Sequence, residues 1–129
     1  MNLFSDPCLV FPKTNKKYAW FYDSQLKLFC VLPKRECLSQ IAQQLWDAFI
    51  ACMPVIQKQS LHDFQWSIDS LDGLLLHCKP QRIWLCIDEP LPKRLSHLNY
   101  SPSPQAWLTH PLLKKQVWQL WQKILNSRV

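Results

Sequence analysis

Two adjacent carboxylates, Asp88 and Glu89, are the side chains of this sequence best placed to do chemistry. They follow the apolar run 83–87 and precede Pro90. So short and apolar a run is typical of a strand covered on both faces, and open α/β sheets bind their ligands at the carboxyl ends of such strands. A carboxylate pair at that place can transfer protons or bind a metal ion.

A structural role for the two carboxylates is the alternative, and we favour it. Asp88 then accepts hydrogen bonds from backbone N–H groups in the following turn, and Glu89 points to water. No histidine, lysine or third carboxylate adjoins the pair to complete a catalytic site. We therefore expect no catalytic residue here and a protein that is not an enzyme.

The chain has one glycine, Gly73, among 129 residues. Phosphate-binding loops, dinucleotide-binding turns and the nucleophile elbow all need glycines where the backbone turns tightly or approaches a phosphate. Metal-ligand spacings are also absent from the sequence, since there is no C-x-x-C or H-x-x-x-H and the adjacent side chains of His77 and Cys78 diverge. We expect neither a cofactor nor a metal ion.

Six cysteines allow two interpretations. In a small secreted protein they would form disulfides. We favour free thiols in a reducing cytoplasm, because Cys30 and Cys86 fall within apolar strands and Cys52 falls on the apolar side of a helix. The N-terminus does not have the pattern of a signal peptide, and no apolar run approaches the ~18 residues that span a bilayer. We expect a cytoplasmic protein without membrane contact.

Fifteen Lys and Arg residues against nine Asp and Glu residues give a net charge of +6. Such a surplus suits DNA or an acidic partner protein. Charge alone does not choose between them, because the basic residues form small separated groups: Lys13, Lys16 and Lys17; Lys34 and Arg35; Lys93 and Arg94; Lys114 and Lys115.

We divide the chain into a flexible N-terminal arm, residues 1–17, and a single α/β domain, residues 18–129. The arm has no helical or strand period and holds two prolines. It is too apolar for a tail that only contacts water, so we expect it to become ordered on a partner or to pack back on its own domain. The apolar side chains expected to bind the partner are Leu3, Phe4, Leu9, Val10 and Phe11.

The first half of the domain begins with strands at 18–22 and 26–32. The turn between them is so short that they must pair as an antiparallel hairpin. A helix is predicted from about Cys37 to Met53, since its apolar side chains fill one half of the helical surface, and Pro54 ends it.

The second half is predicted to hold a strand at 64–68, a short helix capped by Ser70, and the buried strand 82–87. A loop broken by four prolines, residues 88–108, leads to a last helix with Thr109 as its N-cap. Strands separated by helices require crossover connections. The order of elements therefore predicts a single α/β domain with a small, partly parallel central sheet.

Three tryptophans of the last third are candidate partner contacts. Trp107 lies in the loop, whereas Trp118 and Trp121 lie on the last helix, whose apolar arc of roughly 160° is wider than a surface helix needs. The excess width indicates a deep groove in the same domain or a partner, and tryptophan is a favoured interface anchor. For each one taken alone we favour a core position, which is also the position expected of Trp66 and Trp84.

Residues 82 to about 124 resemble the psi subunit of the bacterial DNA polymerase III holoenzyme. The closing helix with Trp121-Gln122-Lys123-Ile124 is similar to the last helix of that family, and the upstream order of elements fits the same plan by pattern. The residues that carry the resemblance are Trp84, Asp88, Glu89, Pro90, Leu91, Ser101, Pro102, Leu108 and Pro111.

The resemblance implies a non-enzymatic adaptor with a three-layer α/β/α fold. Such a subunit binds the clamp loader through an N-terminal segment and the chi subunit through its globular body, and it reaches single-strand-binding protein and DNA indirectly through chi. Residues 1–17 depart from the family, because they lack its Trp- and Leu-bearing peptide. A small basic nucleic-acid-binding domain is the alternative, and a small enzyme using Asp88 and Glu89 ranks third.

Overall fold

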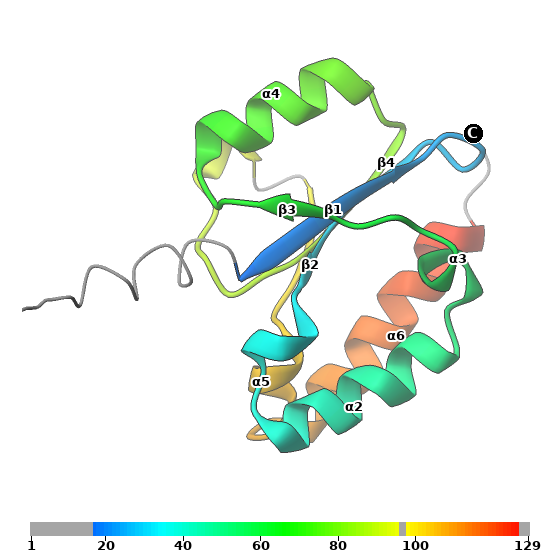
Figure 1. The fold of residues 1–129 in the computed structure, drawn as a ribbon, viewed down its shortest axis with the longest axis vertical. Helices are drawn as coiled ribbons and strands as arrows, with labels where there is room; N and C mark the ends of the chain where they lie inside the picture. Colours follow the sequence, from blue (N-terminus) through cyan, green and yellow to red (C-terminus); the bar gives the residue numbers. More distant parts are fainter. Residues whose placement is uncertain (1–16, 96–97, 127–129) are drawn as a thin grey trace, which may run out of the picture.

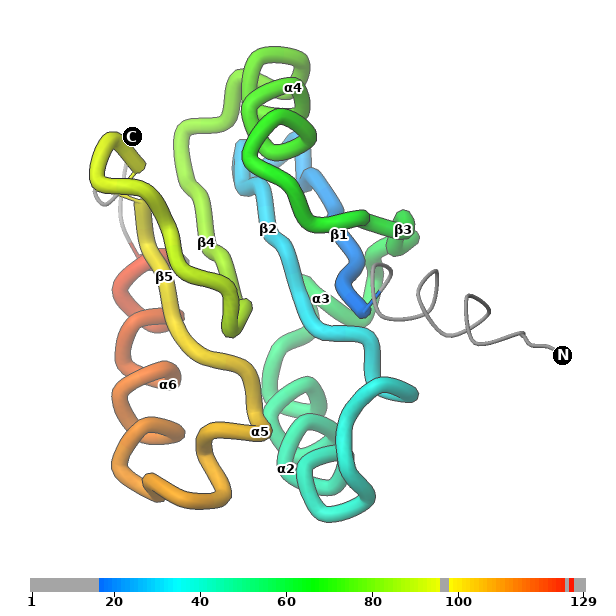
Figure 2. The backbone as a smooth tube through the Cα atoms, turned by 90° about the vertical axis from the view of Figure 1, so that its left-hand side faces the viewer, coloured from blue at the N-terminus to red at the C-terminus, as the bar shows by residue number. Residues whose placement is uncertain are grey.

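The structure is a computed structural model that describes residues 17–95 and 98–126. At the centre of these residues is a five-stranded mixed sheet with the order β3-β1-β2-β4-β5 (Figure 1, Figure 2). The predicted α/β fold with a small, partly parallel sheet is confirmed. The strands are β1 Tyr18–Asp23, β2 Leu28–Pro33, β3 His62–Phe64, β4 Arg82–Cys86 and β5 Asn99–Ser101.

The hairpin predicted for the first two strands is confirmed. β1 and β2 pair antiparallel, with Phe21 opposite Cys30. Asp23 closes the turn between them, because its Oδ1 accepts a hydrogen bond from the Gln25 N–H at 2.9 Å. β3 also pairs antiparallel with β1, whereas β4 runs parallel to both β2 and β5. The parallel pairs follow from the long connections that carry the chain back across the sheet.

Helices cover both faces of the sheet, which confirms the predicted three layers. α4 covers one face, and α2, α3, α5 and α6 lie on the other (Figure 1). Two 3₁₀ turns lie in the connections, η2 between β2 and α2 and η3 between β4 and β5. The bounds are η2 Arg35–Cys37, α2 Gln40–Ala51, α3 Pro54–Gln57, α4 Ile68–Cys78, η3 Lys93–Leu95, α5 Pro104–Trp107 and α6 Pro111–Asn126.

The core has two parts, one on each face of the sheet. In β2, Cys30 packs with Trp46 and Trp121 on the face of α2 and α6, whereas Phe29 and Val31 pack on the face of α4. All six residues of β2 are buried. A strand covered in this way needs no polar side, which is why its sequence is apolar throughout. Each large apolar side chain that is fully buried contributes about 1.5–3 kcal/mol.

The helix predicted at 37–53 is shorter than expected. α2 begins after Ser39, whose Oγ accepts a hydrogen bond from the Ala42 N–H at 3.3 Å. It ends at Ala51, and Pro54 begins α3 rather than ending the helical region. A proline suits the first position of a helix because that N–H has no intrahelical partner.

Two further predictions for the middle of the chain are wrong in detail. The strand predicted at 64–68 covers only His62–Phe64, so Trp66 lies outside it and is half-buried. Ser67, not Ser70, caps α4, since the Ser67 Oγ accepts a hydrogen bond from the Ser70 N–H at 3.0 Å. The cap lies three residues earlier than the apolar pattern indicated.

The segment 88–108, predicted as a loop, contains β5 and α5. β5 has three residues and no apolar period, and it forms because its backbone pairs with β4. The last helix begins at Pro111, so Thr109 is not its N-cap; the Thr109 hydroxyl donates instead to the Ala106 carbonyl at 3.1 Å.

The five cysteines within the described residues are free thiols. Cys30 and Cys86 are buried, as predicted. Cys52 is exposed, which corrects its expected place on the covered side of α2: it is the C-cap of that helix, after its last residue, Ala51. No helix in the described ranges is long and apolar enough to cross a membrane.

Candidate functional site

Just beyond the carboxyl end of β4, Lys17 and Tyr18 from the start of the domain lie beside Asp88 and Glu89. The backbone N–H of Asp88 donates to the Tyr18 hydroxyl at 3.1 Å, and that hydroxyl donates to Glu89 Oε2 at 2.5 Å. Lys17 Nζ lies 3.0 Å from Glu89 Oε1, and the Glu89 side chain is 23% exposed. Glu89 therefore does not point freely to water, which corrects the prediction made for it.

Both carboxylate oxygens of Asp88 accept hydrogen bonds from Ser103. The Ser103 N–H donates to Oδ1 at 3.0 Å, and its hydroxyl donates to Oδ2 at 2.6 Å. Ser103 is the N-cap of α5 and is buried. Asp88 thus accepts a backbone hydrogen bond, as predicted, but the donor lies fifteen residues further on and not in the following turn.

Two phenols complete this cluster. Burial raises the pKa of Tyr18, and its hydrogen bond to Glu89 raises it further. The pKa of Tyr100 is raised by burial and then by the charges of Asp88 and Glu89. Its hydroxyl donates to the Glu89 carbonyl at 3.2 Å. At neutral pH both phenols are therefore protonated hydrogen-bond donors, which makes them poor bases and poor nucleophiles.

The polar groups of this cluster are bonded mainly to one another. The Asp88 carboxylate and the Ser103 hydroxyl already bond to each other, and Glu89 bonds to Tyr18 and Lys17. A hollow of about 210 Å³ lies beside Asp88. Among the described residues, no three His, Cys, Asp or Glu side chains are placed to hold a metal ion. The role that fits the geometry is to tie the N-terminal end of β1 and the start of α5 to the end of β4.

Other residues of the motif that begins at Trp84 make similar internal contacts. The Trp84 Nε1–H donates to the Ser101 Oγ at 2.8 Å in the buried core, which fixes β5 against β4. The Trp107 Nε1–H donates to the Pro102 carbonyl at 3.2 Å. The remaining four are exposed or half-buried: Pro90, Leu91, Leu108 and Pro111.

Two of the three candidate partner-binding tryptophans lie in the core. Trp107 is 2% exposed and Trp121 is 0% exposed. Trp121 packs edge-to-face on Trp84 with ring centroids 4.6 Å apart. Their proposed role as partner contacts is therefore corrected, because the folded domain itself covers them. Trp118 is 36% exposed and remains a candidate.

The apolar residues predicted to bind a partner through the arm fall outside the described residues. They are Leu3, Phe4, Leu9, Val10 and Phe11.

A groove between α2 and α6 holds the exposed tryptophan. Its volume is about 490 Å³, and its surface is mostly apolar. Residues far apart in the sequence come together here, so no local pattern indicates the groove; the width of the apolar arc of α6 was its one sequence signal. The lining residues are Ala48, Phe49, Cys52, Pro111, Lys114, Lys115 and Trp118.

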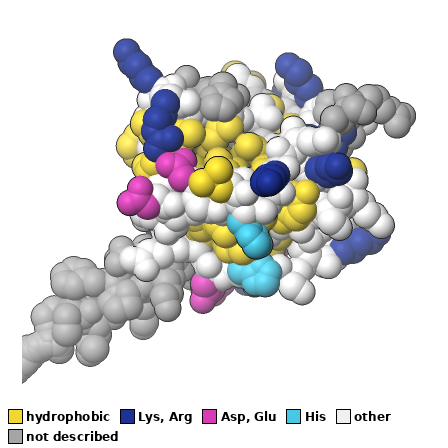
Figure 3. Space-filling view, turned by 90° about the horizontal axis from the view of Figure 1, so that it is seen from above, with side chains coloured by type: hydrophobic (Ala, Val, Ile, Leu, Met, Phe, Trp, Pro, Cys, Tyr) yellow, Lys and Arg dark blue, Asp and Glu magenta, His cyan; other side chains and the backbone are white. Residues whose placement is uncertain are grey.

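The face of α4 carries a second apolar area. Figure 3 looks onto the molecule from that side and shows hydrophobic side chains gathered among charged ones. Leu76 is 75% exposed there. Asp72 of α4 pairs with Arg94 at 2.8 Å, so charges of both signs border this area.

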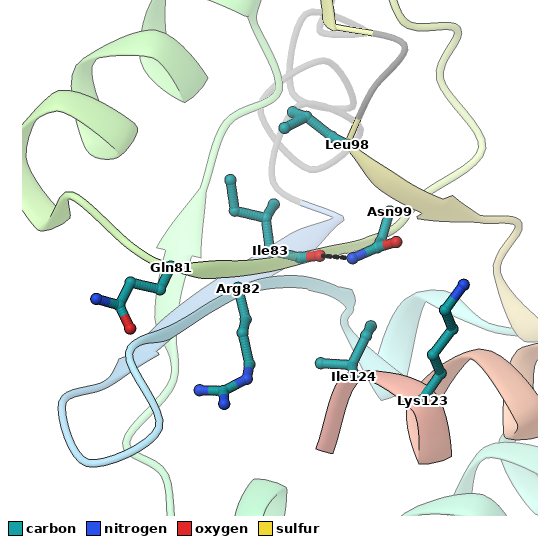
Figure 4. A pocket seen from close by; sticks show the side chains of 7 residues that line it. All are labelled: Gln81, Arg82, Ile83, Leu98, Asn99, Lys123 and Ile124. Carbon is teal, nitrogen blue, oxygen red and sulfur yellow. Dashed lines mark hydrogen bonds between the residues drawn. The ribbon is translucent and has the colours of Figure 1, made fainter. Parts of the chain in front are cut away.

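A third hollow, of about 310 Å³, lies where β4, β5 and the end of α6 meet (Figure 4). Its polar groups are already engaged in part: Asn99 Nδ2 donates to the Ile83 carbonyl at 3.0 Å, and Arg82 Nη1 donates to the Leu26 carbonyl. Lys123 lies in the last turn of α6, whose carbonyl end attracts cations. These features do not favour an anion in this hollow.

No protein-family model, no curated protein and no solved structure matches the chain.

Proposed function

We propose that this chain is a non-enzymatic, psi-like adaptor subunit of the bacterial DNA polymerase III holoenzyme. In this proposal it acts in the cytoplasm and bridges the clamp loader to the chi subunit, and through chi to single-strand-binding protein and DNA. The resemblance of residues 82 to about 124 to the psi family supports the proposal, together with the α/β fold that the structure has.

The observation that carries the proposal is that both motif carboxylates, Asp88 exposed and Glu89 half-buried, are bonded to other residues of the domain. Asp88 bonds to Ser103, and Glu89 bonds to Tyr18 and Lys17. A catalytic pair must be free to contact a substrate, whereas these two hold the ends of β1, β4 and α5 together. A motif with this structural role suits a binding module better than an enzyme.

Co-expression with a chi-type subunit of the same source tests the proposal. We expect the two proteins to elute together from gel filtration as a one-to-one complex at micromolar concentration. Separate elution of the two folded proteins contradicts the proposal.

The clamp-loader half of the proposal needs its own experiment. In a chain without residues 1–14, we expect the melting temperature to stay nearly unchanged and chi binding to persist, while clamp-loader binding is lost. A drop of many degrees would mean that the arm belongs to the core. Unchanged affinity for the clamp loader would place that contact elsewhere.

Direct nucleic-acid binding is the second candidate function, and the distribution of charge favours it. All nine Asp and Glu residues lie at or before Glu89, so the net charge of +6 comes from residues 90–129. We expect weak binding to single-stranded DNA that falls steeply with salt, because the basic residues are scattered. Submicromolar binding at physiological salt, with quenching of tryptophan fluorescence, would favour this function over the adaptor.

A further inference from the structure

We propose that the groove between α2 and α6 binds an acidic segment of the protein partner, with a large apolar side chain of that segment against Trp118. This inference deepens the proposed function and rests on it, since it names the surface of the globular body that binds the chi-type subunit and the chemistry of the segment bound.

The groove has a rigid aromatic wall. Trp118 packs edge-to-face on Phe49, with ring centroids 6.1 Å apart and planes at 84°. Phe49 is 3% exposed and belongs to the core, so the domain holds Trp118 in place while 36% of its surface stays exposed. The small side chain of Ala48 leaves space beside the two rings. A preformed apolar hollow of this kind loses little conformational entropy when a side chain enters it.

The apolar surface continues along α2. Ile41 is 62% exposed and lies seven residues before Ala48 and eleven before Cys52, so the three share one side of the helix. Eleven residues of helix extend about 16 Å. That length matches about three turns of a partner helix, laid with its apolar side in the groove.

The charge of the groove selects an acidic occupant. Lys114 and Lys115 line it, and among the described residues its lining includes no carboxylate. The ion pairs given by the described part of the chain are formed by other residues, so carboxylates of a partner can approach both amines. No Asp or Glu follows Glu89 in the sequence to neutralise α6. Opposite charges at the rim of an interface speed association and set its orientation.

The same charge argues against two other arrangements. A second copy of this chain would place the lysines of one groove against those of another, which costs free energy. The α4 face is the competing surface for an acidic segment, but Asp69 lies on that helix and Asp72 there already pairs with the cation of Arg94. The groove is therefore the surface that best fits an acidic, apolar segment.

Binding of the full chain to the chi-type subunit of the same source, measured by isothermal titration calorimetry, tests the inference. We expect Trp118→Ala to weaken binding at least about 30-fold, as for a central interface anchor. The double variant Lys114→Glu/Lys115→Glu should weaken it about 10-fold and reduce its salt dependence. Leu76→Ala, which truncates an exposed apolar side chain, and Lys58→Glu/Lys93→Glu, which reverses two exposed lysine charges, are the controls at positions elsewhere, and they should leave the affinity within about threefold.

A second measurement does not depend on a substitution. Cys52 lines the groove, whereas Cys37, also exposed, lines the hollow beside Asp88. We expect the chi-type subunit to slow alkylation of Cys52 by iodoacetamide at least about tenfold, and to leave Cys37 unaffected, as mass spectrometry of the peptides would show.

The outcomes separate the two proposals. If the wild-type chain does not bind the subunit, the proposed function fails and this assignment fails with it. If the wild type binds and the groove variants bind equally well while Cys52 reacts unprotected, the adaptor stands and the groove is not its surface. A loss of affinity in Leu76→Ala alone would assign the partner to α4 and overturn the inference.

Discussion

Asp88 and Ser103 are joined by two hydrogen bonds, one from the serine N–H and one from its hydroxyl, and each goes to a different oxygen of the carboxylate. Asp88 lies two residues after the end of β4, and Ser103 is the N-cap of α5. The N–H that Asp88 binds is one that the short helix cannot satisfy itself. This pair therefore joins the sheet to the segment that leads into α6.

Replacing Asp88 by Ala should lower the free energy of unfolding by about 1–2 kcal/mol, because the buried Ser103 loses the acceptor of both hydrogen bonds. Asp88→Asn keeps one acceptor oxygen and should lose less. Urea denaturation followed by fluorescence measures both values. Binding of the chi-type subunit should persist in each variant. An unchanged stability with lost partner binding would instead make Asp88 part of a binding site.

The Tyr18 phenol should make stability fall at alkaline pH. Burial and the bond to Glu89 raise its pKa above the ordinary value of 10.0 in the folded chain. Above that pH the unfolded chain releases this proton while the folded chain keeps it, so the stabilisation is complete below pH 10 and is lost as pH rises further. One such group contributes a slope of at most about 1.4 kcal/mol per pH unit.

Tyr18→Phe isolates this effect. The variant should be less stable than the wild type at about pH 8, by roughly 1–2 kcal/mol, because two hydrogen bonds are lost. Its stability should then fall less steeply above about pH 10. Burial also raises the pKa of the Cys30 and Cys86 thiols, so both proteins should share a decline that begins near pH 9.0. Urea midpoints across this range measure the slopes, and identical slopes would contradict the assignment to Tyr18.

Trp84 and Trp121 should respond differently to replacement by phenylalanine. Trp84→Phe removes the bond to Ser101 that fixes β5 and leaves a small cavity, so we expect a loss of about 2–3 kcal/mol. The Trp121 Nε1–H is buried without a hydrogen-bond partner in the part of the chain that the structure describes. Removing that N–H offsets part of the cavity cost, so Trp121→Phe should cost about 1 kcal/mol. Thermal and urea unfolding measure both values. If the two variants lose the same free energy of unfolding, the unpaired N–H of Trp121 has no energetic effect.

Lys79→Gly should stabilise the protein. Lys79 caps the end of α4 with a φ of 49°, a left-handed conformation that a side chain disfavours and glycine adopts freely. We expect a gain of about 0.5–1 kcal/mol in the free energy of unfolding. Lys58→Gly is the matched control, since Lys58 ends α3 at a φ of −83° and should lose stability. If both variants have a lower free energy of unfolding than the wild type, the left-handed backbone at Lys79 is not strained.

The sequence by itself determined the α/β class of this protein. The apolar run of β4 required cover on both faces, the short turn after Asp23 required a hairpin, and the one-sided pattern of α2 required an apolar surface to pack on. These are local signals, because the period of a strand or helix shows which sides of that element are buried. They were sufficient for the α/β class with a partly parallel sheet.

Only the tertiary structure decided what the residues at the end of β4 do. Glu89 bonds to Tyr18, which lies 71 residues earlier, and nothing near Glu89 in the sequence indicates this partner. The three residues of β5 are too few to show a period in the sequence. The strand can be recognised only from the pairing of its backbone with β4. The tryptophans of the last third differ for the same reason: Trp118 and Trp121 share one apolar arc, and the positions of α2 and the sheet determine which is covered and which stays in the groove.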